Sequence, residues 1–385
     1  MVIGVVGAGA SGMAAALAAA ENQENTVILL ERQARVGKKL LATGNGRCNL
    51  TNLNTDAAKY HGNASAFAAP ALELYSVSDT LDWFANMGLY TVVEDSGRVY
   101  PYSDQANSVV DVLRFALEKE NIELKLGFEV SRIKKTEDGF AVESKKETVI
   151  CDRLIIACGG LAGTQQGGSM SGYQLLRSMG HRMTKLRPAL VQLKTSDSVA
   201  ALKGVRANCK AQIYKDGALH GESVGEIQFT DYGISGPVIF EVSRDVCADK
   251  GEWVCRLDFL PDISEEKLIS MICRPGEEML TGILHNRLGK VLAKAGGYDK
   301  AQVAQKVKAY ELLLLEPMGM DKAQVTAGGI ITDDFDPNTM ESQIVHGLYA
   351  CGEVLDIDGD CGGYNLQWAW SSGRCAGDSA GRGKP

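Results

Sequence analysis

Several motifs that mark common chemistries are missing from this chain of 385 residues. None of its ten cysteines belongs to a C-x-x-C pair, which argues against zinc-knuckle and thioredoxin-type sites. No H-E-x-x-H, G-x-S-x-G or EF-hand pattern occurs and the five histidines are scattered, so no metal site is expected. The apolar run from Ala14 to Ala20 is too short to span a bilayer, so no membrane partner is expected.

Positive charge is scarce as well, because 40 lysines and arginines stand against 48 aspartates and glutamates, giving a formal net charge of −8. Nonspecific nucleic-acid binding requires a basic face that displaces counterions, so we expect no nucleic-acid partner. No basic stretch with a cleavage site precedes the first apolar strand, and unpaired cysteines suit a reducing compartment. We therefore expect a cytoplasmic protein; the sequence carries no signal for an oligomeric state.

Glycine, in contrast, is abundant, with 43 residues, and one glycine-rich segment lies close to the start. An apolar strand, residues 2–6, leads into G-x-G-x-x-G, followed by a helix of small residues and a second strand ending at Glu31. Gly7, Gly9 and Gly12 permit a tight turn, close approach to a pyrophosphate and close packing of helix on strand. Glu31 is placed to accept hydrogen bonds from ribose hydroxyls, and the whole unit predicts dinucleotide binding.

A second glycine-rich segment lies near the other end of the chain. Gly352 and Glu353 follow an apolar strand, and Gly363-Tyr364-Asn365 precedes a predicted helix over 366–376. A helix N-terminus carries free N–H groups and partial positive charge, which would favour a reduced flavin anion at its N1–C2=O edge. A dinucleotide that contacts both ends must be long and firmly held, which favours FAD over a nicotinamide that comes and goes.

The polar loop Gly37–Asn52 follows the second strand and suits a segment running along a ribityl chain and flavin. Arg47 could stabilise negative charge on reduced flavin or substrate. Cys48 is either a reactive thiol activated by Arg47 or a small packing residue. Arg47, Cys48 and Tyr364 are the catalytic candidates. Asp231 and Tyr232, in the segment DYGISGP, are either acid–base groups or turn and core residues, and Pro237 fits a first helical position.

The residues expected to bind the cofactor come from both ends and from the connecting loops. They are Gly7, Gly9, Ala10, Ser11, Gly12, Glu31, Arg32, Lys39, Thr43, Gly44, Asn45, Gly46, Arg47, Cys48, Asn49, Val130, Cys158, Gly159, Gly160, Gly352, Glu353, Asp358, Gly363, Tyr364 and Asn365.

The predicted fold class is α/β, with a Rossmann-like FAD-binding domain of the two-dinucleotide-binding flavoprotein type that is interrupted by an insert. The discontinuous domain is expected over 1–187 and 320–385. A small β-barrel-like unit is expected over 188–262, where apolar runs are short and alternating, and a helical unit over 263–319. Helices are predicted at 265–272, 276–292 and 300–314.

Seven segments together resemble one family, the HI0933-like or BaiN-like flavoproteins of bacteria. The segments are GAGASGMAAA, TGNGRCNLTN, GRVYPYSDQANSVVD, LIIACGG with GSMSGYQLL, FTDYGISGP and GLYACGEVLDIDGDCGGYNLQWAWSSG. The resemblance implies a three-part architecture, bound FAD and an oxidoreductase activity, which in some members concerns steroid-like enones. It also implies an ADP half at Gly7, Gly9, Gly12 and Glu31, and a ribityl–flavin half at Arg47, Cys48, Asn49, Glu353, Gly363, Tyr364 and Asn365.

The leading functional hypothesis is an FAD-dependent oxidoreductase that moves hydride from NAD(P)H through flavin N5 to an activated C=C or C=O of a small apolar substrate. Only one good dinucleotide fingerprint occurs, so NAD(P)H would be a transient donor. One alternative is an oxidase of an amine or hydroxy substrate that uses oxygen. Another is a flavin-binding redox sensor or RNA-associated protein, by fold analogy. Tyrosine, aspartate, cysteine and water all remain open as the proton donor.

Overall fold

The computed structural model describes residues 1–382 and divides the chain into two compact units. One unit combines Met1–Leu186 with the chain from Val325 onward, and the other is Arg187–Gln324. The chain passes from the first unit to the second through β12 (Arg187–Ala189) and returns through β19 (Val325–Ala327).

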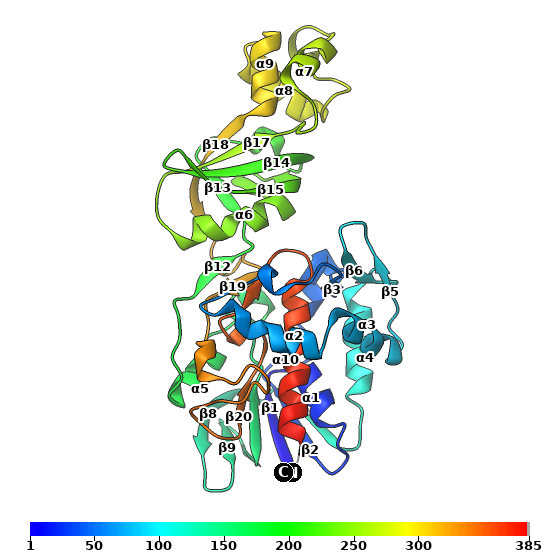
Figure 1. Cartoon of the computed structure of the whole chain (residues 1–385), viewed down its shortest axis with the longest axis vertical. Helices are drawn as coiled ribbons and strands as arrows, with labels where there is room; N and C mark the ends of the chain where they lie inside the picture. Colours follow the sequence, from blue (N-terminus) through cyan, green and yellow to red (C-terminus); the bar gives the residue numbers. More distant parts are fainter. Residues whose placement is uncertain (383–385) are drawn as a thin grey trace. The chain divides into compact units, whose positions relative to one another are not determined.

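The first unit is built on a five-stranded parallel sheet with the order β20-β11-β1-β2-β7 (Figure 1). Four of its strands are mostly buried and apolar, as expected inside a parallel sheet covered on both faces, whereas the edge strand β7 has no buried residue and carries Glu123 and Lys125. Residues from both ends of the chain meet here, since β20 pairs with β11 and β11 pairs with β1. The bounds are β1 (Val2–Val6), β2 (Thr26–Glu31), β7 (Ile122–Leu126), β11 (Arg153–Ile156) and β20 (Leu348–Ala350). The predicted Rossmann-like fold is confirmed.

Helices α1 (Ala10–Ala19) and α10 (Tyr364–Gly381) lie side by side against this sheet (Figure 1). A Cβ on Gly377 would lie 2.1 Å from the carbonyl oxygen of Ala15, so only glycine permits this approach. Gly381 meets Ala19 one turn later, which means that the two helices run parallel. Both helix N-termini therefore point the same way.

Smaller elements of the first unit surround this core. The helix α3 begins with a capping box in which Ser76 and Asp79 bond each other's backbone N–H groups. Antiparallel strands are β8 (Val130–Lys135), β9 (Phe140–Ser144) and β10 (Thr148–Cys151); β3 (Thr51–Asn52), β6 (Arg98–Pro101) and β5 (Thr91–Val93); and β4 (Tyr60–His61) with β21 (Asp358–Gly359). The helices are η1 (Leu40–Gly46), η2 (Ala57–Lys59), η3 (Ser65–Ala68), α2 (Ala69–Leu74), α3 (Val77–Asn86), α4 (Ala106–Ala116), η4 (Thr164–Gln166), α5 (Ser171–Ser178), η7 (Thr332–Asp334) and η8 (Gly352–Val354).

The second unit contains a closed barrel with the strand order β13-β16-β15-β14-β17-β18, which confirms the predicted β-barrel. Alternate residues of its strands are buried, for example Trp253, Cys255 and Leu257 in β17. The bounds are β13 (Leu193–Thr195), β14 (Arg206–Lys215), β15 (Ala218–Phe229), β16 (Gly233–Ser235), β17 (Trp253–Asp258) and β18 (Tyr310–Pro317). The helices are η5 (Ala200–Leu202), α6 (Pro237–Ala248), α7 (Glu265–Met271), η6 (Gly276–Glu278), α8 (Asn286–Ala295) and α9 (Lys300–Lys308).

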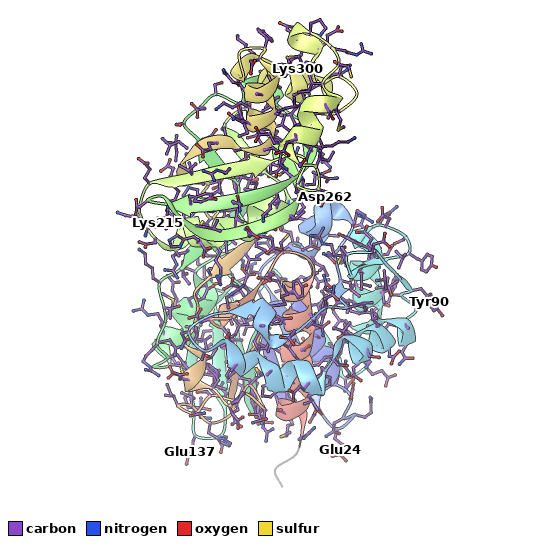
Figure 2. All side chains as sticks on the ribbon, turned by 45° about the horizontal axis from the view of Figure 1, so that its top comes forward. Glu24, Tyr90, Glu137, Lys215, Asp262 and Lys300 are labelled. Carbon is purple, nitrogen blue, oxygen red and sulfur yellow. The ribbon has the colours of Figure 1, made fainter. Side chains whose placement is uncertain are left out.

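Two of the predicted helices in this unit are partly wrong. The segment 300–314 is helical only as far as Lys308, because Tyr310–Pro317 forms β18 and pairs with β17 and β13. The segment 276–292 contains the short η6, then a turn, and α8 begins only at Asn286. Figure 2 labels Lys215 at the end of β14 and Lys300 at the start of α9, and shows the barrel and helical parts of the unit.

Within the described chain, no helix combines the length and the hydropathy that crossing a membrane requires. Residues 1–382 also contain no group of three or more histidine, cysteine, aspartate or glutamate side chains arranged to hold a metal ion.

Candidate functional site

The turn between β1 and α1 excludes side chains at two glycines and leaves space at a third. Gly7 has φ 104°, and a Cβ there would lie 2.5 Å from the carbonyl oxygen of Ala157. A Cβ on Gly12 would lie 1.8 Å from the carbonyl oxygen of Gly7. At Gly9, apart from Gly9 and its chain neighbours, no atom of the described residues lies within 4 Å of the Cβ position, and no side chain there caps the helix. An uncapped helix N-terminus with open space beside it is suited to an anion.

Glu31 lies at the end of β2 and is 8% exposed. Its two carboxylate oxygens accept hydrogen bonds from the N–H groups of Ala8, at 2.7 Å, and of Gln33, at 2.8 Å. Glu31 therefore holds the glycine turn in place, and each oxygen keeps a lone pair for a hydroxyl donor. The next residue, Arg32, donates to the carbonyl oxygen of Gly167.

Glu353 joins the second glycine segment to two other predicted residues. Its Oε2 pairs with Lys39 Nζ at 2.8 Å, and its Oε1 accepts from the N–H of Thr326 at 2.8 Å. A Cβ on Gly160 would lie 2.3 Å from Oε1, so the turn after β11 needs glycine beside this carboxylate. Lys39, Gly160 and Glu353 come from three distant parts of the sequence, and the fold brings them together.

The N-terminus of α10 is the second open helix end. Its N-cap is Gly363, with φ 105° and no side-chain cap in the described chain. A Cβ on Gly363 would lie 2.4 Å from the carbonyl oxygen of Thr51 and 3.0 Å from Asn49 Oδ1. Asn49 Oδ1 is itself buried and has no hydrogen-bond partner within residues 1–382. A buried acceptor without a partner is costly, so this oxygen fits a ligand that carries an N–H donor.

Asn365 turns back toward its own loop. Its Oδ1 accepts from the N–H of Gly359 at 2.8 Å, and its Nδ2 donates to the carbonyl oxygens of Gly359, at 2.8 Å, and Asp360, at 3.3 Å. Tyr364 is 6% exposed, and its carbonyl oxygen accepts from the hydroxyl of Tyr60 at 3.0 Å. These contacts fix the shape of the loop that leads into α10.

The two catalytic candidates of the polar loop occupy different surroundings. Arg47 donates to Asp104 and, at 3.0 Å, to Glu94, and it lies 4.0 Å above the ring of Tyr100. Cys48 is fully buried, and burial raises the pKa of its thiol from 9.0 to about 12 despite a hydrogen bond from Thr43. The packing role thus suits Cys48 better than the role of a reactive thiol.

Asp231 and Tyr232 lie in the barrel unit, just before β16. Asp231 pairs with Lys203 at 2.7 Å, and that hydrogen bond holds the pKa of the carboxyl below its usual range. The hydroxyl of Tyr232 donates to Gln192, and burial raises its pKa. Pro237 starts α6 as predicted.

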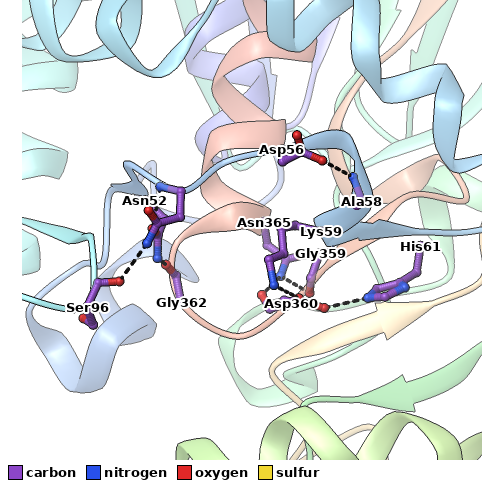
Figure 3. A network of polar contacts seen from close by, with 11 residues as sticks. Asn52, Asp56, Ala58, Lys59, His61, Ser96, Gly359, Asp360, Gly362 and Asn365 are labelled. Atoms are coloured by element: carbon purple, nitrogen blue, oxygen red, sulfur yellow. Dashed lines mark hydrogen bonds and ion pairs between the residues drawn. The ribbon is translucent and has the colours of Figure 1, made fainter. Parts of the chain in front are cut away.

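Some polar residues near the site escaped the sequence analysis. His61 contacts Asp360 at 2.7 Å, and Lys59 pairs with the same carboxylate at 3.3 Å (Figure 3). Thr326 Oγ1 accepts from the N–H of Ala162 at 2.8 Å, and Ser372 Oγ accepts from the N–H of Gly352 at 3.0 Å. No motif in the sequence marks Lys59, His61 or Thr326, and although Asp360 and Ser372 lie within a quoted segment, their contacts depend on the tertiary fold.

Comparison with known proteins shows the family to which the chain belongs. The family model described as the HI0933-like protein Rossmann domain matches residues 1–379. The chain is 39% identical to the 3-dehydro-bile acid delta(4,6)-reductase of Clostridium scindens, covering 98% of each chain. It is 31% identical to the ribosomal RNA dihydrouridine synthase of Escherichia coli K12, covering 97% of this chain and 96% of that protein.

A solved structure, the open conformation of a flavocytochrome c3 fumarate reductase, shares the fold with a TM-score of 0.53. That match has 18% identity and covers 98% of this chain and 78% of the other. The predicted family and the predicted enzyme class are thereby confirmed. The chain belongs to the HI0933-like family and is an FAD-dependent oxidoreductase.

Proposed function

We propose that one FAD molecule extends from the N-terminus of α1, which holds the pyrophosphate, to the N-terminus of α10, which holds the flavin. Ser11 and Gly373 lie at the same level of the parallel pair. Gly373 is the tenth residue of α10, whereas Ser11 is the second residue of α1. At a rise of about 1.5 Å per residue, the N-terminus of α10 therefore lies about 12 Å beyond the N-terminus of α1 along the helix axis. A five-carbon ribityl chain with its phosphate ester suits this offset.

The residues at each end match the chemistry of the corresponding half. Gly9 leaves room for phosphate, and Glu31 can accept bonds from ribose hydroxyls. Lys39 and Glu353 form the polar pair between the two ends. At α10, the partnerless Asn49 Oδ1 would accept from an N–H group of the bound flavin, and the first N–H groups of the uncapped helix would donate to its carbonyl side. The bound flavin supplies a hydride at N5.

We propose that the reaction saturates a C=C bond conjugated to a carbonyl. A delta(4,6)-reductase acting on a 3-dehydro-bile acid and a dihydrouridine synthase share this bond type in the substrates that their names imply. The partial positive charge at the start of α10 stabilises negative charge on the flavin side of the reaction. NAD(P)H is the proposed donor, and as no second dinucleotide fingerprint occurs it would bind transiently.

A small apolar enone is the preferred substrate class. The 39% identity to the bile-acid reductase exceeds the 31% identity to the RNA-modifying relative, and a net charge of −8 opposes RNA binding. A uridine in ribosomal RNA is the second candidate, because two dihydrouridine synthases match nearly the whole chain at 31% and 29% identity.

An anaerobic absorbance experiment tests both the cofactor and the reaction. We expect yellow protein that bleaches with NADH or NADPH and is reoxidised by a 4,6-dien-3-one steroid. Reoxidation by a ribosomal RNA fragment instead would favour the second candidate. Protein that stays oxidised with every nicotinamide under anaerobic conditions, but in a parallel aerobic assay passes electrons from an amine or hydroxy substrate to oxygen and releases peroxide, would establish the oxidase alternative. Colourless protein that cannot be loaded with FAD would overturn the proposal.

A further inference from the structure

A histidine–carboxylate pair lies beside the start of α10. The two-residue strands β4 and β21 pair so that His61 faces Asp358 and Tyr60 faces Gly359. His61 Nε2 lies 2.7 Å from Asp360 Oδ1, and Lys59 Nζ lies 3.3 Å from Oδ2 of the same carboxylate. Figure 3 shows the imidazole pointing toward Asp360, in the loop that leads to Gly362 and Asn365.

Backbone and side-chain bonds tie this pair to the first turn of α10. The N–H of Asp360 donates to the carbonyl oxygen of Lys59 at 3.0 Å, and the carbonyl oxygen of Asp360 accepts from Asn365 Nδ2 at 3.3 Å. The Tyr60 hydroxyl donates to the carbonyl oxygen of Tyr364 at 3.0 Å. A charge gained on His61 is therefore held at a fixed place beside the end of the helix.

His61 supplies the imidazole of this cluster, and its ring is partly open to solvent. Its side chain is 35% exposed, and imidazole is the side chain that ordinarily titrates between about pH 5 and 8. Burial raises the pKa of Asp360, but the bonds from His61 and Lys59 outweigh burial and hold that pKa below its usual range. The other titratable or charged groups of this region come from three segments. Asp56, Lys59 and Tyr60 precede His61 in the chain, and Asp356, Asp358, Asp360 and Cys361 belong to the segment around the facing strand β21. Tyr364 is the first residue of α10.

We propose that His61 takes up a proton when the bound FAD is reduced. His61 then acts as a positioning residue, because its positive charge beside the N-terminus of α10 raises the reduction potential of the FAD. This inference rests on the FAD site proposed above. Two electrons and one proton from a reductant and solvent reduce the flavin, with the proton at N5 and a negative charge left at N1–C2=O. A second proton from solvent binds His61 and gives an imidazolium beside Asp360, which balances that charge.

The test measures the midpoint potential of FAD-loaded protein against pH, with dithionite and reference dyes. In the wild type we expect the slope of midpoint potential against pH to correspond to two protons per two electrons over part of the range from about pH 5 to 8. In His61→Gln we expect one proton per two electrons over that same part. The matched control is His346→Gln, because His346 also pairs with a carboxylate, Glu341 at 2.8 Å, but precedes the amino end of β20, whereas Gly352 and Glu353 follow the carboxyl end of that strand.

Three results would overturn the inference: equal slopes in His61→Gln and the wild type, a one-proton slope in the wild type at every pH, or a spectrum showing that the second proton binds the flavin. The second of these needs no variant, so the test survives a His61→Gln protein that fails to fold. Asp360→Asn should move the two-proton interval to lower pH, because the imidazolium loses its counter-charge. Wild-type protein that binds no FAD would overturn the proposed function itself, whereas loaded protein with equal slopes would overturn only the role of His61.

Discussion

The carbonyl oxygen of Ser11 lies 2.4 Å from where a Cβ on Gly373 would be, so α1 and α10 touch through their backbones. This contact joins the first and last helices of the chain and fixes their relative height. The interval between the two helix N-termini follows directly from it. In the FAD site proposed above, the packing of small residues therefore sets the distance that the cofactor would span between the two helix N-termini.

Gly377→Ala should destabilise the protein even though alanine is the better helix former. In an unhindered helix the change would stabilise by up to about 1 kcal/mol. Here the new Cβ would lie 2.1 Å from the carbonyl oxygen of Ala15, and forcing the helices apart costs roughly 1–3 kcal/mol. Urea unfolding of the apoprotein measures the difference, and an unchanged midpoint would contradict the close helix contact.

Gly9→Ala should leave the stability of the protein almost unchanged but weaken FAD binding. Apart from the chain neighbours of residue 9, no atom of the described residues lies within 4 Å of the new Cβ, and the backbone φ of −81° is ordinary for alanine, so stability should change by less than about 0.5 kcal/mol. The methyl group would occupy the space proposed for the pyrophosphate. We expect FAD affinity to fall about tenfold or more, roughly 1.4 kcal/mol, by fluorescence titration. Unchanged affinity would place the phosphates elsewhere.

The sequence predicted the parts of the fold and site that local patterns encode. The strand–glycine–helix unit and Glu31 follow from spacing within about 30 residues. His61 and Asp360 could not be predicted together, because two-residue strands at distant positions bring them into contact. The start of β18 was predicted to be helical because Leu312–Leu315 consists of leucines only and shows no alternation of apolar and polar residues. In the structure these leucines do alternate in burial, since Leu312 is buried and Leu313 is 38% exposed.

Cys48 should resist alkylation in the native protein. Its thiol is fully buried, and burial raises its pKa to about 12, so almost no thiolate forms near neutral pH. Cys273 is exposed and serves as the internal control. Mass spectrometry after iodoacetamide treatment at pH 7.5 should find Cys273 modified and Cys48 intact, and Cys48→Ala should keep the rate of flavin reduction within about twofold. Rapid labelling of Cys48 would restore the reactive-thiol interpretation.

The same burial predicts a loss of stability in alkaline solution. Because the pKa of Cys48 is higher in the folded protein than in the unfolded chain, its contribution is full below about pH 8.5 and is lost as pH rises toward 12. Cys48→Ala should therefore show a smaller decrease in unfolding free energy between pH 8 and pH 10 than the wild type. Cys273→Ala is the control and should keep the wild-type slope, and equal slopes in all three proteins would contradict the assignment.

Asn49→Leu should affect the apoprotein and the FAD-loaded protein in opposite directions. Asn49 Oδ1 is buried beside Gly363 and lacks a partner within residues 1–382, so replacing the amide with an apolar group of similar size should leave apoprotein stability unchanged or slightly higher. If this oxygen accepts a bond from flavin N3–H, its removal should weaken FAD binding by about tenfold, roughly 1.4 kcal/mol. Thermal unfolding with and without FAD measures both effects. Asn121→Leu is the matched control, since Asn121 Oδ1 is also buried without a partner but lies just before β7, away from both helix N-termini. Equal loss of FAD affinity in the two variants would mean that Asn49 acts only through the stability of the fold.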